Sequence, residues 1–190
     1  MKNEIINMIN ESIDVKKQIV NSDLVDEIDK AAKIIINTYK NGGKILICGN
    51  GGSAADSQHV AGELINKFRI NRRPLGAIAL STDSSVITSI GNDFSFDEIF
   101  KKQVEGNGKS GDVLIGISTS GNSKNVIAAV EMAKRIGMKT IALTGRSGGK
   151  LKDVADMCLK VPSDDTPRIQ ESHIMILHIM CDIIEQELFG

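Results

Sequence analysis

The chain has 190 residues, 41% of them apolar, and its 23 Lys and Arg against 24 Asp and Glu give a net charge of −1. This length and composition are typical of one domain over residues 1–190, and the lack of a basic run argues against nucleic acid as a direct partner. The N-terminus is amphipathic and mixed in charge, so it predicts neither a signal peptide nor a membrane span, and we expect a cytoplasmic protein.

Two helices are predicted before any strand. Residues 3–20 carry apolar side chains over more than one narrow stripe, so this helix needs more than one neighbour. Ser22 is placed to cap a second helix over residues 23–39, which Asn41-Gly42-Gly43 ends with residues that tolerate the left-handed conformation. Residues 1–40 are therefore expected to form a helical segment packed on the remainder of the domain.

Five short apolar runs alternate with helical patterns in the rest of the chain. The predicted strands are residues 44–48, 75–80, 113–117, 139–143 and 157–161. The predicted helices are residues 53–66, 84–90, 94–104, 126–133, 151–155 and 166–189, with a break at Gly91-Asn92-Asp93. This alternation specifies a right-handed parallel sheet with helices on both faces, a three-layer αβα sandwich of the α/β class. Its ligand is expected outside the carboxyl ends of the strands.

The turn from Ser118 to Ser123 is a candidate phosphate site. It joins a buried apolar strand to an amphipathic helix, where unpaired N–H groups and the positive end of the helix dipole can hold an anion without a lysine. Gly121 lets the backbone come close, and the four hydroxyl side chains can donate to phosphate oxygens. A serine-rich turn that binds nothing is an equally good interpretation of this loop taken alone.

Neither a nucleotide motif nor a disulfide framework is found. The glycine-rich turn from Gly49 to Ser53 fails the G-x-G-x-x-G spacing, and no G-K-[ST] closes it as in a Walker loop. Cys48, Cys158 and Cys181 are odd in number and lie in apolar stretches, which favours buried reduced thiols. A nucleotide cofactor is therefore not indicated.

Two pairs of residues could carry chemistry. His59 and Glu63 are four apart on one predicted helix, so they can bind a metal, although such a pair alone is more often a surface ion pair. His178 and Asp182 interrupt the apolar stretch 174–184 of the closing helix, which must be buried in the core or in a subunit interface. A buried imidazole beside a carboxylate suits catalysis or the surroundings of a metal, and equally a packed core.

Other polar residues precede His178 on the closing helix. Gln170, Glu171 and His173 lie one to two turns earlier, closer to the expected mouth of the site. Gln170 and His178 are about 12 Å apart along the helix axis. They can converge on one small site only by reaching toward each other.

Five long stretches, in order, carry a resemblance to a known family. They are CGNGGSAADSQHVAGEL, SIGNDFSFDEIF, GISTSGNSKNV, LTGRSGGK and TPRIQESHIMILHI. These stretches are similar to the sugar isomerase (SIS) domain superfamily and, within it, to the phosphoheptose isomerases. The similarity runs from the first helices to the C-terminus.

The resemblance implies a homotetramer with active sites at subunit contacts, N-terminal helices used in oligomerisation, a phosphosugar ligand and one zinc ion per subunit. By motif, the phosphate would lie against Ser118, Thr119, Ser120 and Ser123. The sugar would be held by Asn50, Gly51, Gly52, Glu63, Asn92, Asp93 and Gln170. The zinc ligands would be His59, Glu63, Gln170 and His178.

The implied reaction moves the carbonyl of D-sedoheptulose 7-phosphate from C2 to C1 through a cis-enediol, the first step of nucleotide-activated heptose biosynthesis. It needs a base, an acid and stabilisation of the enediolate, and we assign Glu63 as the base and His178 as the acid. Zinc bound to the sugar oxygens would act as a Lewis acid. The alternative is a non-catalytic tetramer of the same fold, a replication-initiator adaptor or a phosphosugar sensor, which has no need of the four metal-binding residues.

Overall fold

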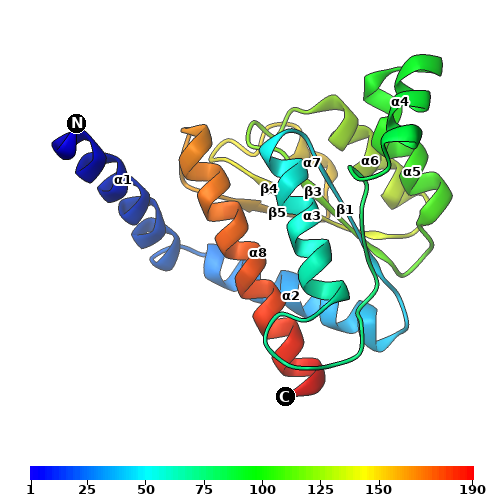
Figure 1. Ribbon diagram of the computed structural model, residues 1–190, viewed down its shortest axis with the longest axis horizontal. Coiled ribbons are helices and arrows are strands. Elements are labelled where there is room, and N and C mark those ends of the chain that lie inside the picture. The colour runs from blue at the N-terminus through cyan, green and yellow to red at the C-terminus, as the bar shows by residue number, and fades with distance from the viewer.

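A computed structural model describes residues 1–190 (Figure 1). The helices are α1 Lys2–Val20, α2 Leu24–Lys40, α3 Gly52–Ile65, α4 Ser84–Asp93, the 3-10 turn η1 Phe96–Glu98, α5 Ile99–Asn107, α6 Lys124–Arg135, α7 Leu151–Val154 and α8 Thr166–Phe189. The strands are β1 Ile45–Gly49, β2 Ala77–Ala79, β3 Val113–Ile117, β4 Lys139–Thr144 and β5 Met157–Lys160. No helix combines the length and the apolar character needed to cross a bilayer.

All five strands are parallel and lie in the order β2-β1-β3-β4-β5. β1, β3 and β4 are central strands buried along nearly their whole length, as their unbroken apolar runs predict. The predicted parallel α/β sheet is therefore confirmed.

Helices cover both faces of the sheet, because alternate strand residues point to opposite sides. Ile45 and Ile47 of β1 face a cluster of buried residues from α1, α2, α3 and α8. Leu46 and Cys48 face a second cluster from α5, α6 and α7. The three layers are the predicted αβα sandwich, and α3 and α8 lie side by side on one face, running in the same direction (Figure 1).

The predicted break at Gly91-Asn92-Asp93 is wrong. α4 continues through all three residues to Asp93, and Phe94 N–H still donates to the Ile90 carbonyl at 3.0 Å. Gly91 keeps a negative φ, so it takes the helical conformation that any residue could adopt. The break comes instead after the helix, before the short turn η1.

Strand β2 is shorter than predicted. It lies at the edge of the sheet and pairs only with β1, so the regular ladder is limited to three residues. The flanking hydrogen bonds from Ile45 N–H to the Gly76 carbonyl and from Leu80 N–H to the Ile47 carbonyl extend the contact at both ends. The predicted apolar run therefore does lie along β1, although only its centre is regular strand.

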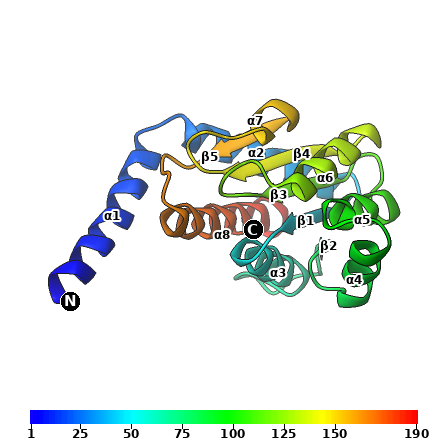
Figure 2. The same cartoon turned by 90° about the horizontal axis from the view of Figure 1, so that it is seen from above.

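Helix α1 projects from the body of the protein in both views (Figures 1 and 2). Only Val15 and Ile19 of this helix are buried. Its exposed apolar residues are Ile5, Ile6, Met8, Ile9, Ile13 and Val20. The predicted apolar stretch 174–184 on α8 is likewise only partly covered, since Ile179 is 40% exposed.

Candidate active site

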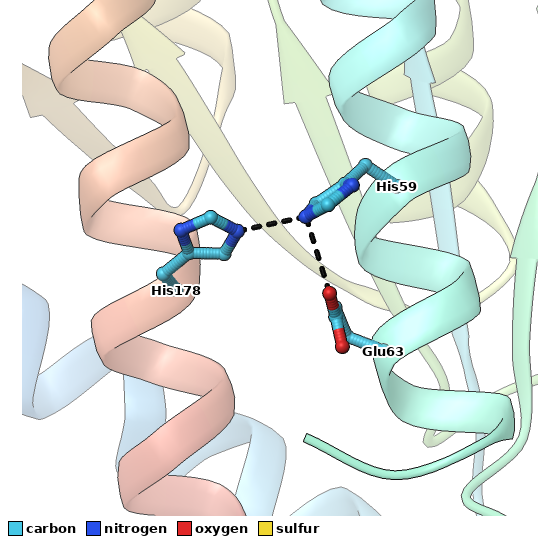
Figure 3. Close-up of side chains that lie close together, drawn as sticks. All are labelled: His59, Glu63 and His178. Atoms are coloured by element: carbon cyan, nitrogen blue, oxygen red, sulfur yellow. Dashed lines mark hydrogen bonds and ion pairs between the residues drawn. The ribbon is translucent and has the colours of Figure 1, made fainter. Parts of the chain in front are cut away.

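Helices α3 and α8 bring three ionisable side chains together (Figure 3). His59 Nε2 on α3 lies 2.8 Å from His178 Nε2 on α8 and 3.2 Å from Glu63 Oε1. One ligand atom from each residue lies within 4.8 Å of the other two. The predicted pairing of His59 with Glu63 is thus observed, and His178 joins it from the neighbouring helix.

The donor set of this cluster fits a metal ion. Two imidazole nitrogens and a carboxylate are ligands that zinc prefers, and in a tetrahedral site with bonds of about 2.1 Å the ligand atoms stand about 3.4 Å apart. The separations of 2.8 and 3.2 Å from His59 need a small opening to reach that spacing, and all three ligand atoms already lie within 4.8 Å of one another. His59 and Glu63 are held on one face by their four-residue spacing, so the ligand pair on α3 is set by the helix itself.

The predicted partnership of His178 with Asp182 is wrong. His178 is half-buried, and its ring packs against His59 and Phe68, with ring centroids 5.0 and 5.7 Å apart. Asp182 Oδ2 instead forms an ion pair with Arg69 Nε at 3.2 Å, and its Oδ1 is buried without a partner. Arg69, which pairs with Asp182, lies in the segment after α3. Helix spacing alone could not predict the position of that segment beside α8.

The turn from Ser118 to Ser123 has the geometry of an anion site. Ser123 lies at the N-cap of α6, but its hydroxyl makes no bond to the helix and meets the Ser118 hydroxyl at 2.9 Å. Ser120 Oγ lies 3.5 Å from Ser118 Oγ and accepts from the Asn122 N–H. The hydroxyl groups therefore gather at the start of α6, where the helix dipole favours negative charge.

A second loop presses against this turn. Gly121 has φ +67°, and a Cβ there would stand 2.1 Å from the Gly148 carbonyl oxygen. Only glycine fits such a conformation and such an approach. Beside the two loops lies a polar cavity of about 300 Å³, lined in part by Thr119, Ser120 and Arg146. The cavity gives a bound anion room next to the turn.

A pair of side-chain amides joins the turn after β1 to the start of α6, next to the turn from Ser118 to Ser123. Asn50 and Asn125 donate to each other's side-chain oxygen, both at 2.9 Å. Gly51 takes φ +56°, and Gly52 starts α3 directly beneath Gln170, whose Nε2 lies 2.6 Å from where a Cβ on Gly52 would stand. Gln170 is therefore at the first turn of α3, whereas His59 lies about 10 Å further along the helix axis.

Asn92 and Asp93 do not join these residues within one chain. Both are exposed at the end of α4, where the Asn92 amide donates to Asp93 Oδ1 at 2.9 Å. α4 packs mainly on α5 and η1, apart from α3 and α8 (Figure 2). A single chain therefore leaves Asn92 and Asp93 apart from the predicted sugar contacts on α3 and α8.

Sequence reasoning missed Asn125 and Asp56 near the site, and it placed His173 at the mouth of the site without predicting its burial. Asn125 holds Asn50, and His173 is fully buried on α8 with Nε2 3.1 Å from the Thr144 carbonyl oxygen. Asp56 lies one turn before His59 on α3 with a buried, unpartnered Oδ2. Burial raises the pKa of the Asp56 carboxyl, and the nearby His59 and His178 partly oppose that rise. Its three-residue spacing from His59 is the signal that could have found Asp56.

Several known proteins are similar to this chain along most of its length. The family described as SIS domain matches residues 9–145. The phosphoheptose isomerase of Clostridium acetobutylicum is 56% identical, over 100% of this chain and 97% of that protein. That of Helicobacter pylori (strain P12) is 57% identical over 86% of this chain and 85% of its own length. The solved structure of phosphoheptose isomerase GmhA from Neisseria gonorrhoeae matches with a TM-score of 0.92 and 47% identity, over 97% of this chain and 98% of that one.

Proposed function

This chain belongs to the phosphoheptose isomerases of the SIS domain family and is a phosphosugar isomerase, and from that premise we propose that it converts D-sedoheptulose 7-phosphate to D-glycero-D-manno-heptose 7-phosphate, its C2 epimer, or both. The observation that carries the proposal is the convergence of His59, Glu63 and His178. A non-catalytic tetramer of the same fold has no physical need of this cluster. An isomerase needs a base, an acid and a group that stabilises the enediolate at one point.

The phosphate of the substrate would bind at the turn from Ser118 to Ser123. Hydroxyl and backbone N–H groups at the start of α6 can donate to its oxygens without a lysine. Thr119 and Ser120 line the adjacent cavity. From the bound phosphate, the sugar would extend toward Gly51 and Gly52. Binding energy from this remote group would orient the reacting end and so raise the rate as well as the affinity.

Proton transfer would use the cluster between α3 and α8. Glu63 takes the carbon-bound proton and returns it to the neighbouring carbon, while His178 exchanges protons with the two sugar oxygens. His59, Glu63, Gln170 and His178 would hold zinc, to which Gln170 must reach from the first turn of α3. Zinc, when bound, would polarise the sugar oxygens and make the carbon-bound proton more acidic. Ligation also stabilises the charged carboxylate, so Glu63 is the stronger base when it does not bind the metal.

We also propose a homotetramer. The exposed apolar residues of α1 adjoin a second apolar region, a cavity of about 270 Å³ between α1, α2 and α8 lined by Val25, Met175 and Ile179. Contiguous apolar surface of this kind is typical of an interface between subunits. In a tetramer, the exposed Asn92 and Asp93 of one subunit could reach the sugar bound by another, which would explain why one chain leaves them apart.

The test is incubation of the purified protein with sedoheptulose 7-phosphate and detection of the aldose by NMR. Unphosphorylated sedoheptulose is the matched control, and its turnover should be far lower because it cannot use the turn at Ser118. Removal of zinc with a chelator should abolish the NMR signal of the aldose, and addition of zinc should restore it. No aldose from the phosphorylated sugar, with zinc present and the protein folded, would refute the proposed reaction.

A further inference from the structure

A buried ion pair joins the end of α3 to α8. Arg72 Nε lies 2.9 Å from Glu185 Oε1, and the two side chains are 1% and 0% exposed. The same guanidinium donates from Nη1 to the Leu64 carbonyl at 2.8 Å and from Nη2 to the Glu63 carbonyl at 3.1 Å. One side chain therefore bonds both to the last turn of α3 and to α8.

Glu185 also fixes the segment that follows α3. Its Oε1 accepts from the Phe68 N–H at 2.9 Å, and its Oε2 accepts from the N–H groups of Arg69 and Ile70. The Phe68 ring is thereby held 5.7 Å from the His178 ring, and Arg69 is held against Asp182. Both contacts lie on the part of α8 that carries His178.

The stability of the fold does not by itself explain this arrangement. Taking two charges out of water is costly, and apolar side chains of similar volume often give equal or greater stability than a buried ion pair. What the pair provides is directional geometry, because a guanidinium and a carboxylate accept only a few relative positions. The two helices that it joins are the ones whose side chains must converge at His59, Glu63 and His178.

We propose that Arg72 and Glu185 are positioning residues for the reaction. They set the separation and rotation of α3 against α8 at which the imidazole of His178 meets the ligand pair on α3. Arg72 acts directly on the backbone of Glu63, and Glu185 acts on His178 through Phe68. This role rests on the proposed function of the cluster and adds to it two residues that touch neither substrate nor metal.

The deciding variant is Glu185→Gln. A glutamine has one carboxamide oxygen, so it can satisfy only some of the four N–H donors that now face the carboxylate, and it removes the charge that holds Arg72. The matched control is Asp112→Asn, another fully buried carboxylate, which accepts from Lys44 N at 2.9 Å, Lys44 Nζ at 2.6 Å and Lys109 N at 3.1 Å. None of the hydrogen-bond partners of Asp112 belongs to α3 or α8.

Both variants should unfold at lower urea concentration than the parent, but only Glu185→Gln should disturb the cluster. Its zinc affinity, measured without sugar by competition with a chromogenic chelator, should fall by about 10-fold or more, as for loss of groups that orient metal ligands. Its kcat should fall while the affinity for inorganic phosphate stays unchanged. Asp112→Asn should keep the parent's zinc affinity and kcat at a temperature where both variants are folded.

A second variant covers the case in which Glu185→Gln fails to fold. Arg72→Lys keeps the positive charge beside Glu185, but one ammonium group cannot reach Glu185 and both carbonyls at once, so it should show the same loss of zinc affinity. Zinc affinity and kcat within twofold of the parent in either folded variant would overturn the proposal. Equal losses in Asp112→Asn would also overturn it. If the parent binds zinc but does not isomerise the sugar, the proposed reaction is refuted instead. If the parent binds no zinc, the kcat of the variants relative to the parent decides the positioning role.

Discussion

Protonation of His173 should make the protein markedly less stable in weak acid. This imidazole is fully buried, with Nε2 3.1 Å from the Thr144 carbonyl oxygen and Nδ1 buried without a partner. Burial lowers the pKa of His173 to about 4, and the Thr144 carbonyl opposes only part of that fall. A second proton would have to be placed on Nδ1, where nothing accepts its hydrogen bond.

The difference in the pKa of His173 between the folded and the unfolded state determines how the free energy of unfolding changes with pH. In the unfolded chain a histidine titrates near 6.5, so between pH 6.5 and 4 the unfolded state binds more protons than the folded state, and stability falls as the pH falls. One pKa unit is worth about 1.4 kcal/mol, so the full effect is about 3 kcal/mol, of which about 2 kcal/mol is lost by pH 5. The effect is absent above pH 7, where both states are neutral.

Urea unfolding at pH 7 and pH 5, compared between the parent and His173→Gln, measures this effect. Glutamine can still donate to the Thr144 carbonyl but does not titrate, so it removes the pH dependence of this one position while other groups stay the same. The parent should lose about 2 kcal/mol more than the variant between the two pH values. Equal losses in the two proteins would refute the reasoning and place the protonation of His173 outside this range.

Three further predictions concern the site and the assembly. Glu63→Gln should lower turnover by about 100-fold or more while the substrate still binds, and exchange of solvent deuterium into C1 at the parent's rate would contradict its role as the base. Ser123→Ala should weaken the binding of substrate and inorganic phosphate together by about 1.5 to 3 kcal/mol in calorimetry, and unchanged affinity for both would put the anion elsewhere. Ile9→Asp places a charge on the exposed apolar face of α1 and should give smaller assemblies in light scattering than the parent, which is expected to be a tetramer. A parent that is monomeric at micromolar concentration would rule out the interface.

Local patterns in the sequence were enough to predict the elements and the sheet. Runs such as residues 113–117 are apolar without interruption, and that pattern is typical of a strand covered on both faces. The pairing of His59 with Glu63 depends only on helix spacing and was confirmed for the same reason. Gly91 misled the prediction because a glycine permits a break but does not require one.

Contacts between elements could not be read from local spacing. Asp182 lies one turn from His178, yet it pairs with Arg69, a residue that follows a different helix. Arg72 and Glu185 are 113 positions apart in the chain and meet only because α3 and α8 pack side by side. In each case the partner is decided by how α3, α8 and the segment after α3 pack together, and this packing cannot be derived from one segment alone.

The reciprocal amide pair between Asn50 and Asn125 has a consequence for which sugars can react. It joins the turn after β1 to the start of α6 in the protein itself, so the span from the turn at Ser118 to the first turn of α3 is set before any ligand binds. With the phosphate and the reacting end bound as proposed above, a substrate would have one carbon chain length at which its carbonyl carbons reach Glu63 and His178. A sugar phosphate one carbon shorter would bind its anion normally and still hold its carbonyl short of the base. The protein would then select its substrates by the length of their carbon chain. Sugar phosphates of the wrong length should be poor substrates but good competitive inhibitors.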